Sequence, residues 1–396
     1  MDLTALKQRA CAAIDADREA LIDLSLRIHA NPEVAYCEEK ASAWLTEVLA
    51  ARGFDVERPV ADMPTAFRAT AGSGAPVVAI LAEYDALPGI GHGCGHNIIA
   101  ASAMGAGIGV RAALDELHGT VQVIGTPAEE VYGGKVQMIR AGAFGGIDAA
   151  MMVHPGTRDA VVAKALACAE LTVEYHGREA HAAAQPENGI NALEAMIIAY
   201  NSINSLRQHM RRSARVHGVI TDGGAAPNIV PGHSAASFLV RAEDDEYLEE
   251  LKTRVVACFE AGAHATGAAL ELRWNPNQYA SMNTNMPLAE AFRANFRAIG
   301  RDVPVDEPRG LGSTDMGNVS KIMPGIHPGI AIAPTEVNSH SPQFAEYAAS
   351  DAGMAAVIGA AKALAMTAID VLSDADLRAR MREEFDRSMA PAAVST

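Results

Sequence analysis

The chain has 396 residues, of which 49% are hydrophobic and 20% are charged, a balance that excludes a disordered or fibrous protein. At this length we expect more than one domain. Asp and Glu outnumber Lys and Arg by 48 to 32, and the formal net charge of -16 argues against nucleic acid or an anionic membrane as a partner.

The N-terminal segment, residues 1 to 30, is charged throughout and places its apolar side chains three and four positions apart. This spacing predicts an amphipathic helix and no signal peptide. The five cysteines are scattered and odd in number, so we expect no disulfide framework. A cytoplasmic protein with reduced thiols is therefore expected.

Apolar strands and helices alternate through the next part of the chain. Strands are expected at 77–85, 120–126 and 148–154, and helices at 98–117 and 135–144. Near-continuous apolar strands separated by helices are typical of a parallel sheet covered on both faces. The same layer resumes with a strand at 325–334 and a helix at 352–372. That helix is long enough to span a membrane, but its many alanines and its charged Lys362 and Asp370 predict a buried core helix.

The middle of the chain has a different pattern, with the order strand, helix, strand, strand, helix, strand. This order is that of a ferredoxin-like α+β unit. We therefore predict an α/β fold in which residues 1–166 and 279–396 form one discontinuous domain with a mostly parallel sheet covered by helices. The ferredoxin-like domain, residues 167–278, is inserted into it.

Side chains able to bind metals follow each strand of the predicted parallel sheet. Because the carboxyl ends of parallel strands meet at one edge of a sheet, we expect these side chains to lie together. They are Asp85, Cys94 and His96 after the first strand, Glu129 and Glu130 after the second, His154 at the end of the third, and His340 after the last. Thiolate, imidazole and carboxylate groups suit zinc or a similar divalent ion.

The number of candidate ligands indicates two metal ions. Five ligands exceed the four of a tetrahedral zinc, so we expect two ions that share a bridging group, for which we choose Cys94. Asp85 is expected to orient a ligand histidine through its free ring N–H. Of the two adjacent acids, we assign Glu130 to metal and Glu129 to general-base catalysis, although spacing alone does not decide between them.

Each of these motifs also has an ordinary structural interpretation. "GHGCGHN" at 91–97 is by itself a glycine-rich turn, adjacent glutamates are usually a solvated pair, and His154 before Pro155 can simply end a strand. A redox CxxC motif is excluded because Cys94 has no neighbouring cysteine. No glycine-rich nucleotide-binding loop follows a strand.

A series of motifs along nearly the whole chain resembles a known family, the co-catalytic metallopeptidases that include aminoacylases, carnosinase-type dipeptidases and auxin-conjugate amidohydrolases. The chain is most similar to the branch that holds β-alanyl-dipeptide dipeptidases and the B subunit of p-aminobenzoyl-glutamate hydrolase. The motifs are, in order, "HANPE", "EYDALPGIGHGCGHN", "GTPAEE", "HPG", "GREAHAAAQPENGINAL", "GGAAPNIVP", "GSTDMGNVS" and "HSPQF".

The resemblance implies the same metal ligands and the same base, with two divalent ions, zinc or manganese, as cofactors. It also implies that the inserted domain is a lid and dimerisation surface, and that His181 in "GREAH" reaches across a homodimer to polarise the scissile carbonyl. Asn228 and Arg241 match family positions that hold the substrate carboxylate or nearby backbone, and a guanidinium can grip a carboxylate bidentately. Taken singly, these three residues are typical of a helix entry, a turn and a surface strand.

The expected activity is hydrolysis of an amide bond between an acyl or aminoacyl group and an amino acid with a free carboxylate. β-Alanyl dipeptides, N-aroyl glutamates and N-acyl amino acids are the candidate substrates. Asn97 stands where many amidohydrolases of this group carry aspartate, so substrate preference does not transfer from the auxin-conjugate enzymes. The alternative is a catalytically silent subunit that binds metal and ligand within a hetero-oligomeric hydrolase.

Overall fold

The computed structural model describes residues 2–304, 309–310 and 312–390. They form two compact units. Unit 1 comprises residues 1–164 and 282–396, and unit 2 comprises residues 165–281. The segment expected as an inserted domain, residues 167–278, lies within unit 2.

A six-stranded sheet forms the centre of unit 1, in the order β1-β2-β4-β3-β5-β13. Its strands are β1 (Asp55–Glu57), β2 (Phe67–Ser73), β3 (Val77–Ala82), β4 (Gly119–Gly125), β5 (Ala149–Met151) and β13 (Gly325–Ile326). The four strands from β4 to β13 run parallel, whereas β1 and β2 add an antiparallel edge that the sequence analysis did not include. The predicted α/β class with a mostly parallel sheet is confirmed.

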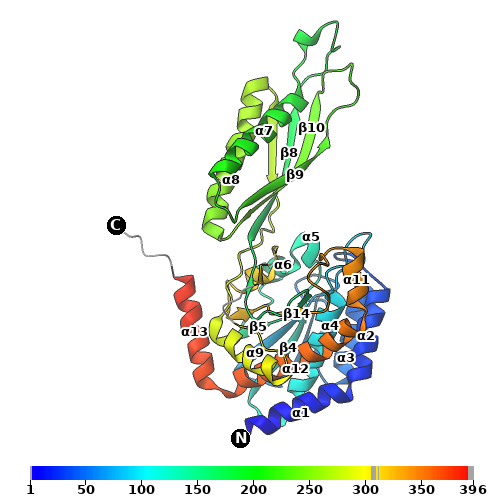
Figure 1. Cartoon of the computed structure of the whole chain (residues 1–396), viewed down its shortest axis with the longest axis vertical. Coiled ribbons are helices and arrows are strands. Elements are labelled where there is room, and N and C mark those ends of the chain that lie inside the picture. Colours follow the sequence, from blue (N-terminus) through cyan, green and yellow to red (C-terminus); the bar gives the residue numbers. More distant parts are fainter. Residues whose placement is uncertain (1, 305–308, 311, 391–396) are drawn as a thin grey trace. The chain divides into compact units, whose positions relative to one another are not determined.

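Both faces of this sheet are buried, which explains why β3 is apolar at every position. Val78 and Ile80 point into one hydrophobic core, while Ala79 and Leu81 point into another. Helices α4 (His96–Arg111) and α12 (Asp351–Ser373) contribute to the first core, and α6 (Gly134–Arg140) and α10 (Met316–Val319) to the second. Figure 1 shows the helices of unit 1 packed around its strands.

Helix α12 is a core helix of unit 1. It is long and apolar enough to span a membrane by length and composition, but 78% of its most apolar window is buried inside the protein. The N-terminal segment forms two helices, α1 (Leu3–Ala16) and α2 (Arg18–Ala30), where one was predicted. The break falls at Asp17, whose carboxylate accepts two hydrogen bonds from Arg52 at 2.6 and 2.7 Å.

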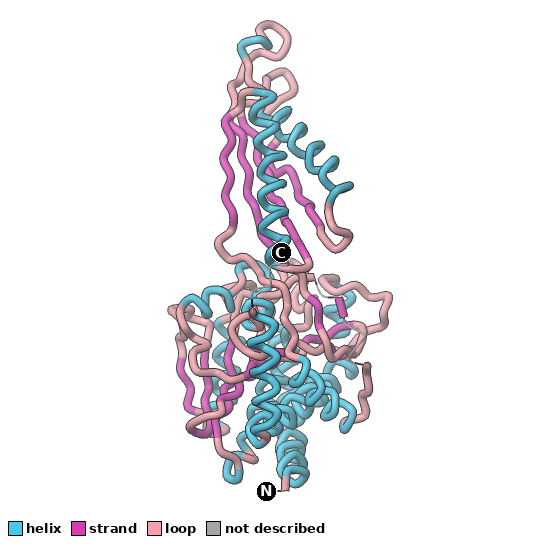
Figure 2. Tube along the Cα trace, turned by 90° about the vertical axis from the view of Figure 1, so that its left-hand side faces the viewer, coloured by secondary structure: helices cyan, strands magenta, loops and turns pink. Residues whose placement is uncertain are grey.

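Unit 2 has the predicted ferredoxin-like order, and its four strands are all antiparallel. Along β8, odd-numbered residues such as Val173 are buried against the two helices, and even-numbered residues such as Glu174 lie on the opposite face. Strands and helices form separate layers (Figure 2). The elements are β8 (Ala167–His176), α7 (Ala192–Leu206), β9 (Arg215–Asp222), β10 (His233–Ala242), α8 (Asp245–Thr266) and β11 (Ala269–Trp274), and the sheet order is β11-β8-β10-β9.

Unit 1 contains further helices and strands. They are α3 (Glu39–Ala51), α5 (Glu129–Tyr132), α9 (Met286–Ala298), α11 (Pro342–Ala348), α13 (Ala375–Met389), β6 (His154–Gly156), β7 (Ala163–Lys164), β12 (Arg309–Gly310) and β14 (Gly329–Ala331). Strand β6, which begins at His154, pairs in parallel with β14 in a separate two-stranded sheet.

Candidate metal centre

The predicted metal ligands lie at the ends of separate elements of unit 1. Cys94 precedes α4 and His96 begins it, Glu130 lies in the first turn of α5, His154 begins β6, and His340 precedes α11. These elements come from four distant parts of the sequence. The structure therefore brings the predicted donors to one edge of the main sheet.

The donor atoms form two groups that share one residue. Cys94 Sγ lies 3.3 Å from His154 Nε2, and Glu130 Oε1 lies 3.6 Å from His340 Nε2. The donors of Cys94, His96 and His154 all lie within 4.8 Å of one another, as do those of Cys94, Glu130 and His340. Two neighbouring divalent ions that share a bridging ligand require one donor common to both groups, and the Cys94 thiolate is in that position.

Hydrogen bonds fix which ring nitrogen of His96 and of His154 faces the centre. His96 Nδ1 lies 3.0 Å from Asp85 Oδ1, and because an ionised carboxylate only accepts, this nitrogen carries the proton. His154 Nδ1 donates to the backbone oxygen of Pro155 at 2.6 Å. Both Nε2 atoms are therefore left with a lone pair towards the other donors, as metal-bound histidines need. Asp85 also accepts from the Glu130 N–H at 3.0 Å, so it orients two ligands.

Several buried donor atoms at the centre face one another with no hydrogen-bond partner among the described residues. They are Glu83 Oε2, His96 Nε2 and Glu130 Oε1. His96 Nε2 lies 3.5 Å from the Glu83 oxygen and 3.7 Å from the Glu130 oxygen. It is costly to bury carboxylate oxygens and an imidazole lone pair together when no hydrogen bond joins them, and a cation bound between them removes that cost. The residues present thus fit a divalent metal.

A buried ion-pair network that the sequence analysis missed lies beside the metal centre. Lys135 Nζ lies 2.5 Å from Glu83 Oε1 and 2.6 Å from Asp315 Oδ1, and all three side chains are buried. Glu83 had a signal in the sequence, because it lies two residues before Asp85 and side chains on a strand alternate. Asp315 lies in the motif "GSTDMGNVS", but nothing in the sequence paired it with Lys135, since only the fold brings together residues 180 positions apart.

The two adjacent acids of α5 belong to different donor groups. Glu129 groups with Glu83 and His96, whereas Glu130 groups with Cys94 and His340. Burial raises the pKa of Glu129 well above its usual range, and the neighbouring carboxylates of Glu83 and Glu130 raise it further. The Glu129 carboxyl therefore holds a proton more tightly than an ordinary glutamate does.

The backbone before these acids has an unusual conformation. Ala128 has a φ of +61°, which L-residues rarely adopt, and its N–H donates to Glu38 Oε1 at 2.9 Å. This turn takes the chain from β4 directly into α5, so that both acids face the centre. Strained residues of this kind are concentrated at functional sites.

Gly95 lies between Cys94 and His96 in the glycine-rich segment. Gly95 has a φ of +79°, and a Cβ at this position would lie only 2.5 Å from Pro155 Cγ. His92 belongs to neither donor group. It is 2% exposed, and burial lowers its pKa to about 3, so the ring is neutral.

Unit 2 holds the other three predicted site residues. His181 and Asn228 lie together, because the N–H of the residue after His181 donates to the Asn228 oxygen at 3.0 Å. His181 Nδ1 accepts two backbone N–H groups, at 3.1 and 3.2 Å, so its Nε2 carries the proton and is a donor. Arg241 is not brought near them. Asn228 comes before His233, the first residue of β10, whereas Arg241 lies eight residues further along that strand, roughly 26 Å at about 3.3 Å per residue.

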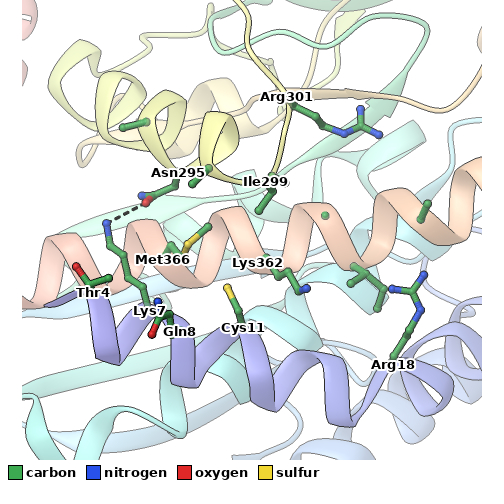
Figure 3. Close-up of a pocket in the computed structure, with 15 residues that line it drawn as sticks. Thr4, Lys7, Gln8, Cys11, Arg18, Asn295, Ile299, Arg301, Lys362 and Met366 are labelled. Carbon is green, nitrogen blue, oxygen red and sulfur yellow. Dashed lines mark hydrogen bonds between the residues drawn. The ribbon is translucent and has the colours of Figure 1, made fainter. Parts of the chain in front are cut away.

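A cavity of about 910 Å³ lies elsewhere in unit 1, lined by residues of α1, α9 and α12 (Figure 3). None of the predicted metal or catalytic residues lines it. Its lysines are engaged, since Lys7 lies 2.6 Å from Asp370 and 2.9 Å from Asn295, and Lys362 lies 2.7 Å from Asp15. We therefore assign this cavity no part in the chemistry of the metal centre.

Comparison with known proteins gives consistent matches. The family model described as peptidase family M20/M25/M40 matches residues 79–367. The Xaa-Arg dipeptidase of Mus musculus is 40% identical over 97% of this chain and 93% of that relative. The B subunit of the p-aminobenzoyl-glutamate hydrolase of Escherichia coli (strain K12) is 35% identical over 66% of this chain and 59% of that relative.

The fold is also found among solved structures. The Bacillus subtilis YXEP protein, described as a dinuclear metal binding peptidase from the M20 family, superposes with a TM-score of 0.71. The match covers 90% of this chain and 99% of that chain at 21% identity. At this identity the likeness supports the fold.

Proposed function

Because the chain belongs to peptidase family M20/M25/M40 and is a metal-dependent amidohydrolase, we propose that it hydrolyses dipeptides whose C-terminal residue is basic and carries a free carboxylate. The family membership confirms the resemblance seen in the motif series. The observation that carries the substrate proposal is the 40% identity to a dipeptidase named for Xaa-Arg substrates, over 97% of this chain. The net charge of -16 also favours the approach of a cationic substrate.

In this proposal the two donor groups around Cys94 hold two divalent ions, zinc or manganese. When bound, such ions polarise the scissile carbonyl and make water acidic enough to lose a proton near neutral pH. Glu129 takes that proton and passes it to the leaving nitrogen. Its burial supports the role, since a carboxyl with a raised proton affinity can both accept and return a proton.

The proposal includes a homodimer formed through unit 2. Strand β9 lies at the edge of its sheet and exposes Val219 and Ile220 at 63% and 42%. An edge strand with exposed apolar side chains is a template for pairing with a second copy. His181 of one protomer then polarises the carbonyl in the partner's centre. Asn228 and Arg241, which lie apart within one chain, hold the substrate carboxylate or the backbone beside it from different protomers. Mixed dimers of His181→Ala and Glu129→Gln protomers should regain activity, whereas inactive mixtures would remove the support for this role.

We further propose a cytoplasmic location. None of the five cysteines forms a disulfide, and one of them, Cys94, must remain a thiolate to bind metal. A reducing compartment preserves that thiolate.

A substrate screen tests the proposed activity. The protein, loaded with zinc or manganese, is assayed with Xaa-Arg and Xaa-Lys dipeptides, β-alanyl dipeptides, p-aminobenzoyl-glutamate and N-acetyl amino acids. Xaa-Arg dipeptides should be cleaved fastest, and their C-terminal amides should resist because the carboxylate is gone. Equal cleavage of the amides would overturn the requirement for a free carboxylate.

Glu129→Gln is the control variant for that screen. We expect kcat to fall by roughly 10² to 10⁴, the range for general acid–base catalysis, while the metal content measured by elemental analysis is unchanged. Turnover at the wild-type rate would move the base elsewhere. If the metal-loaded wild-type protein cleaves none of the substrates, the silent-subunit alternative is favoured.

A further inference from the structure

We propose that unit 2 carries a separate transition-metal site formed by Glu174, His176 and His233. Their donor atoms lie within 4.8 Å of one another, on the face of the sheet opposite helices α7 and α8. The site lies entirely within unit 2, so it is independent of the metal centre in unit 1 and of the proposed hydrolytic function.

The strand register places the three donors together. His233 on β10 is paired directly with His176 on β8, and their ring centroids are 5.2 Å apart. Glu174 lies two residues before His176, hence on the same face. Its Oε2 atom lies 3.2 Å from His233 Nε2 and 4.0 Å from His176 Nε2. Two adjacent strands therefore direct two imidazoles and one carboxylate oxygen at a common point.

A second carboxylate prepares His233 for this role. His233 Nδ1 lies 2.6 Å from Asp222 Oδ2, and the carboxylate accepts the ring proton. Asp222 is itself held, because its other oxygen accepts the Gly224 N–H at 3.0 Å. This bond fixes Nδ1 as a donor. In the metal-free protein Nε2 donates to Glu174 Oε2 at 3.2 Å, so an ion that binds here takes the place of that proton. The same carboxylate–histidine arrangement supports histidine ligands in established metal sites.

The surroundings indicate which ion fits and how tightly it binds. Two imidazoles and one carboxylate favour zinc, nickel or copper over calcium or magnesium. The side chains are partly exposed, which leaves the ion accessible and one coordination position open to water. Arg273 donates to Glu174 Oε1 at 2.8 Å, so the carboxylate is oriented but a positive charge stands beside the ion. The guanidinium thus limits affinity, and a bound ion would tie β8 to β10.

Zinc binding to the full chain tests the proposal. Equilibrium dialysis at about pH 8, above the ordinary pKa of a histidine side chain, should show one zinc ion more per chain in the wild type than in His176→Ala or His233→Ala. His217→Ala is the matched control, because His217 lies on β9 of the same sheet and belongs to none of the described donor groups, and it should bind like the wild type. Asp222→Asn should weaken binding at this site by about 10-fold or more.

A spectroscopic readout separates this site from the metal centre in unit 1. In a Trp44→Phe background, Trp274 on β11 is the remaining tryptophan and reports on unit 2. Zinc should raise the unfolding midpoint of the Trp274 transition in this background and with His217→Ala, but not with His176→Ala. The proposal would be overturned if zinc shifted the midpoint equally in His176→Ala, or if His176→Ala bound as many zinc ions per chain as the protein with His176 intact.

Arg273→Gln guards against misreading a variant that only loosens the sheet. If the cluster is a metal site, removal of the guanidinium tightens zinc binding, the opposite effect to removal of a ligand. If the cluster is only an ion-pair network, Arg273→Gln leaves zinc binding unchanged while it lowers the midpoint of the Trp274 transition, and this result would refute the metal site.

Discussion

Replacing Lys135 with methionine should strongly destabilise unit 1. The ammonium group is fully buried between Glu83 and Asp315 at 2.5 and 2.6 Å. Methionine retains most of the volume but leaves two buried carboxylates without a counter-charge. Breaking a buried pair by removing one partner costs about 3 to 5 kcal/mol, because the remaining charge is uncompensated.

Urea unfolding of the metal-free protein measures this cost. In a Trp274→Phe background, Trp44 on α3 is the remaining tryptophan and reports on unit 1. Lys362→Met is the matched control, because Lys362 pairs at 2.7 Å with Asp15, whose side chain is 51% exposed. An exposed pair of this kind contributes at most about 1 kcal/mol.

The reasoning would be refuted if Lys135→Met lowered the unfolding free energy by no more than Lys362→Met does. A triple variant, Lys135→Met with Glu83→Gln and Asp315→Asn, identifies the cause. Most of the lost stability should return, since no uncompensated charge remains buried. A triple variant as unstable as Lys135→Met alone would mean that packing around the lysine, and not charge, supplies the stability.

Three further predictions follow from the site. Asp85→Asn should weaken metal binding by roughly 10- to 100-fold in a chelator competition, because His96 loses the carboxylate that orients it, and unchanged affinity would contradict this. Gly95→Ala should lower the unfolding midpoint more than Gly74→Ala does, because only the Cβ at position 95 would meet Pro155. Gly74 is the control, since its φ of +75° is similar but the space around a Cβ is open. Equal losses in the two variants would exclude the clash. In metal-free protein, burial and the nearby Asp85 raise the pKa of Glu38 from 4.5 to about 7, so the folded state binds a proton that the unfolded state has released. The contribution of Glu38 to the unfolding free energy should therefore be greatest below pH 4.5 and should fall by about 3 kcal/mol as the pH rises from 4.5 through 7. Urea titrations at several pH values should show this fall in the wild type and not in Glu38→Gln.

The sequence by itself predicted the parallel strands, the inserted ferredoxin-like order and most residues of the candidate metal centre. Continuous apolar runs identify buried strands because both faces of the sheet are covered, as Val78 and Ala79 in opposite cores show. Donors such as Cys94, Glu130 and His154 were predicted together because strand ends in a parallel sheet converge, a rule that needs no knowledge of side-chain contacts.

Only the tertiary structure decided which buried charges meet and which nitrogen of each histidine faces the centre. Lys135 and Asp315 are 180 residues apart, and Asp222 reaches His233 from a neighbouring strand, so neither pairing leaves a local pattern. At the break between α1 and α2, Asp17 likewise meets Arg52 from the end of α3, a contact that the local sequence does not reveal. Periodicity records which side of an element is buried, whereas a hydrogen bond or ion pair depends on the register and packing of elements distant in the chain.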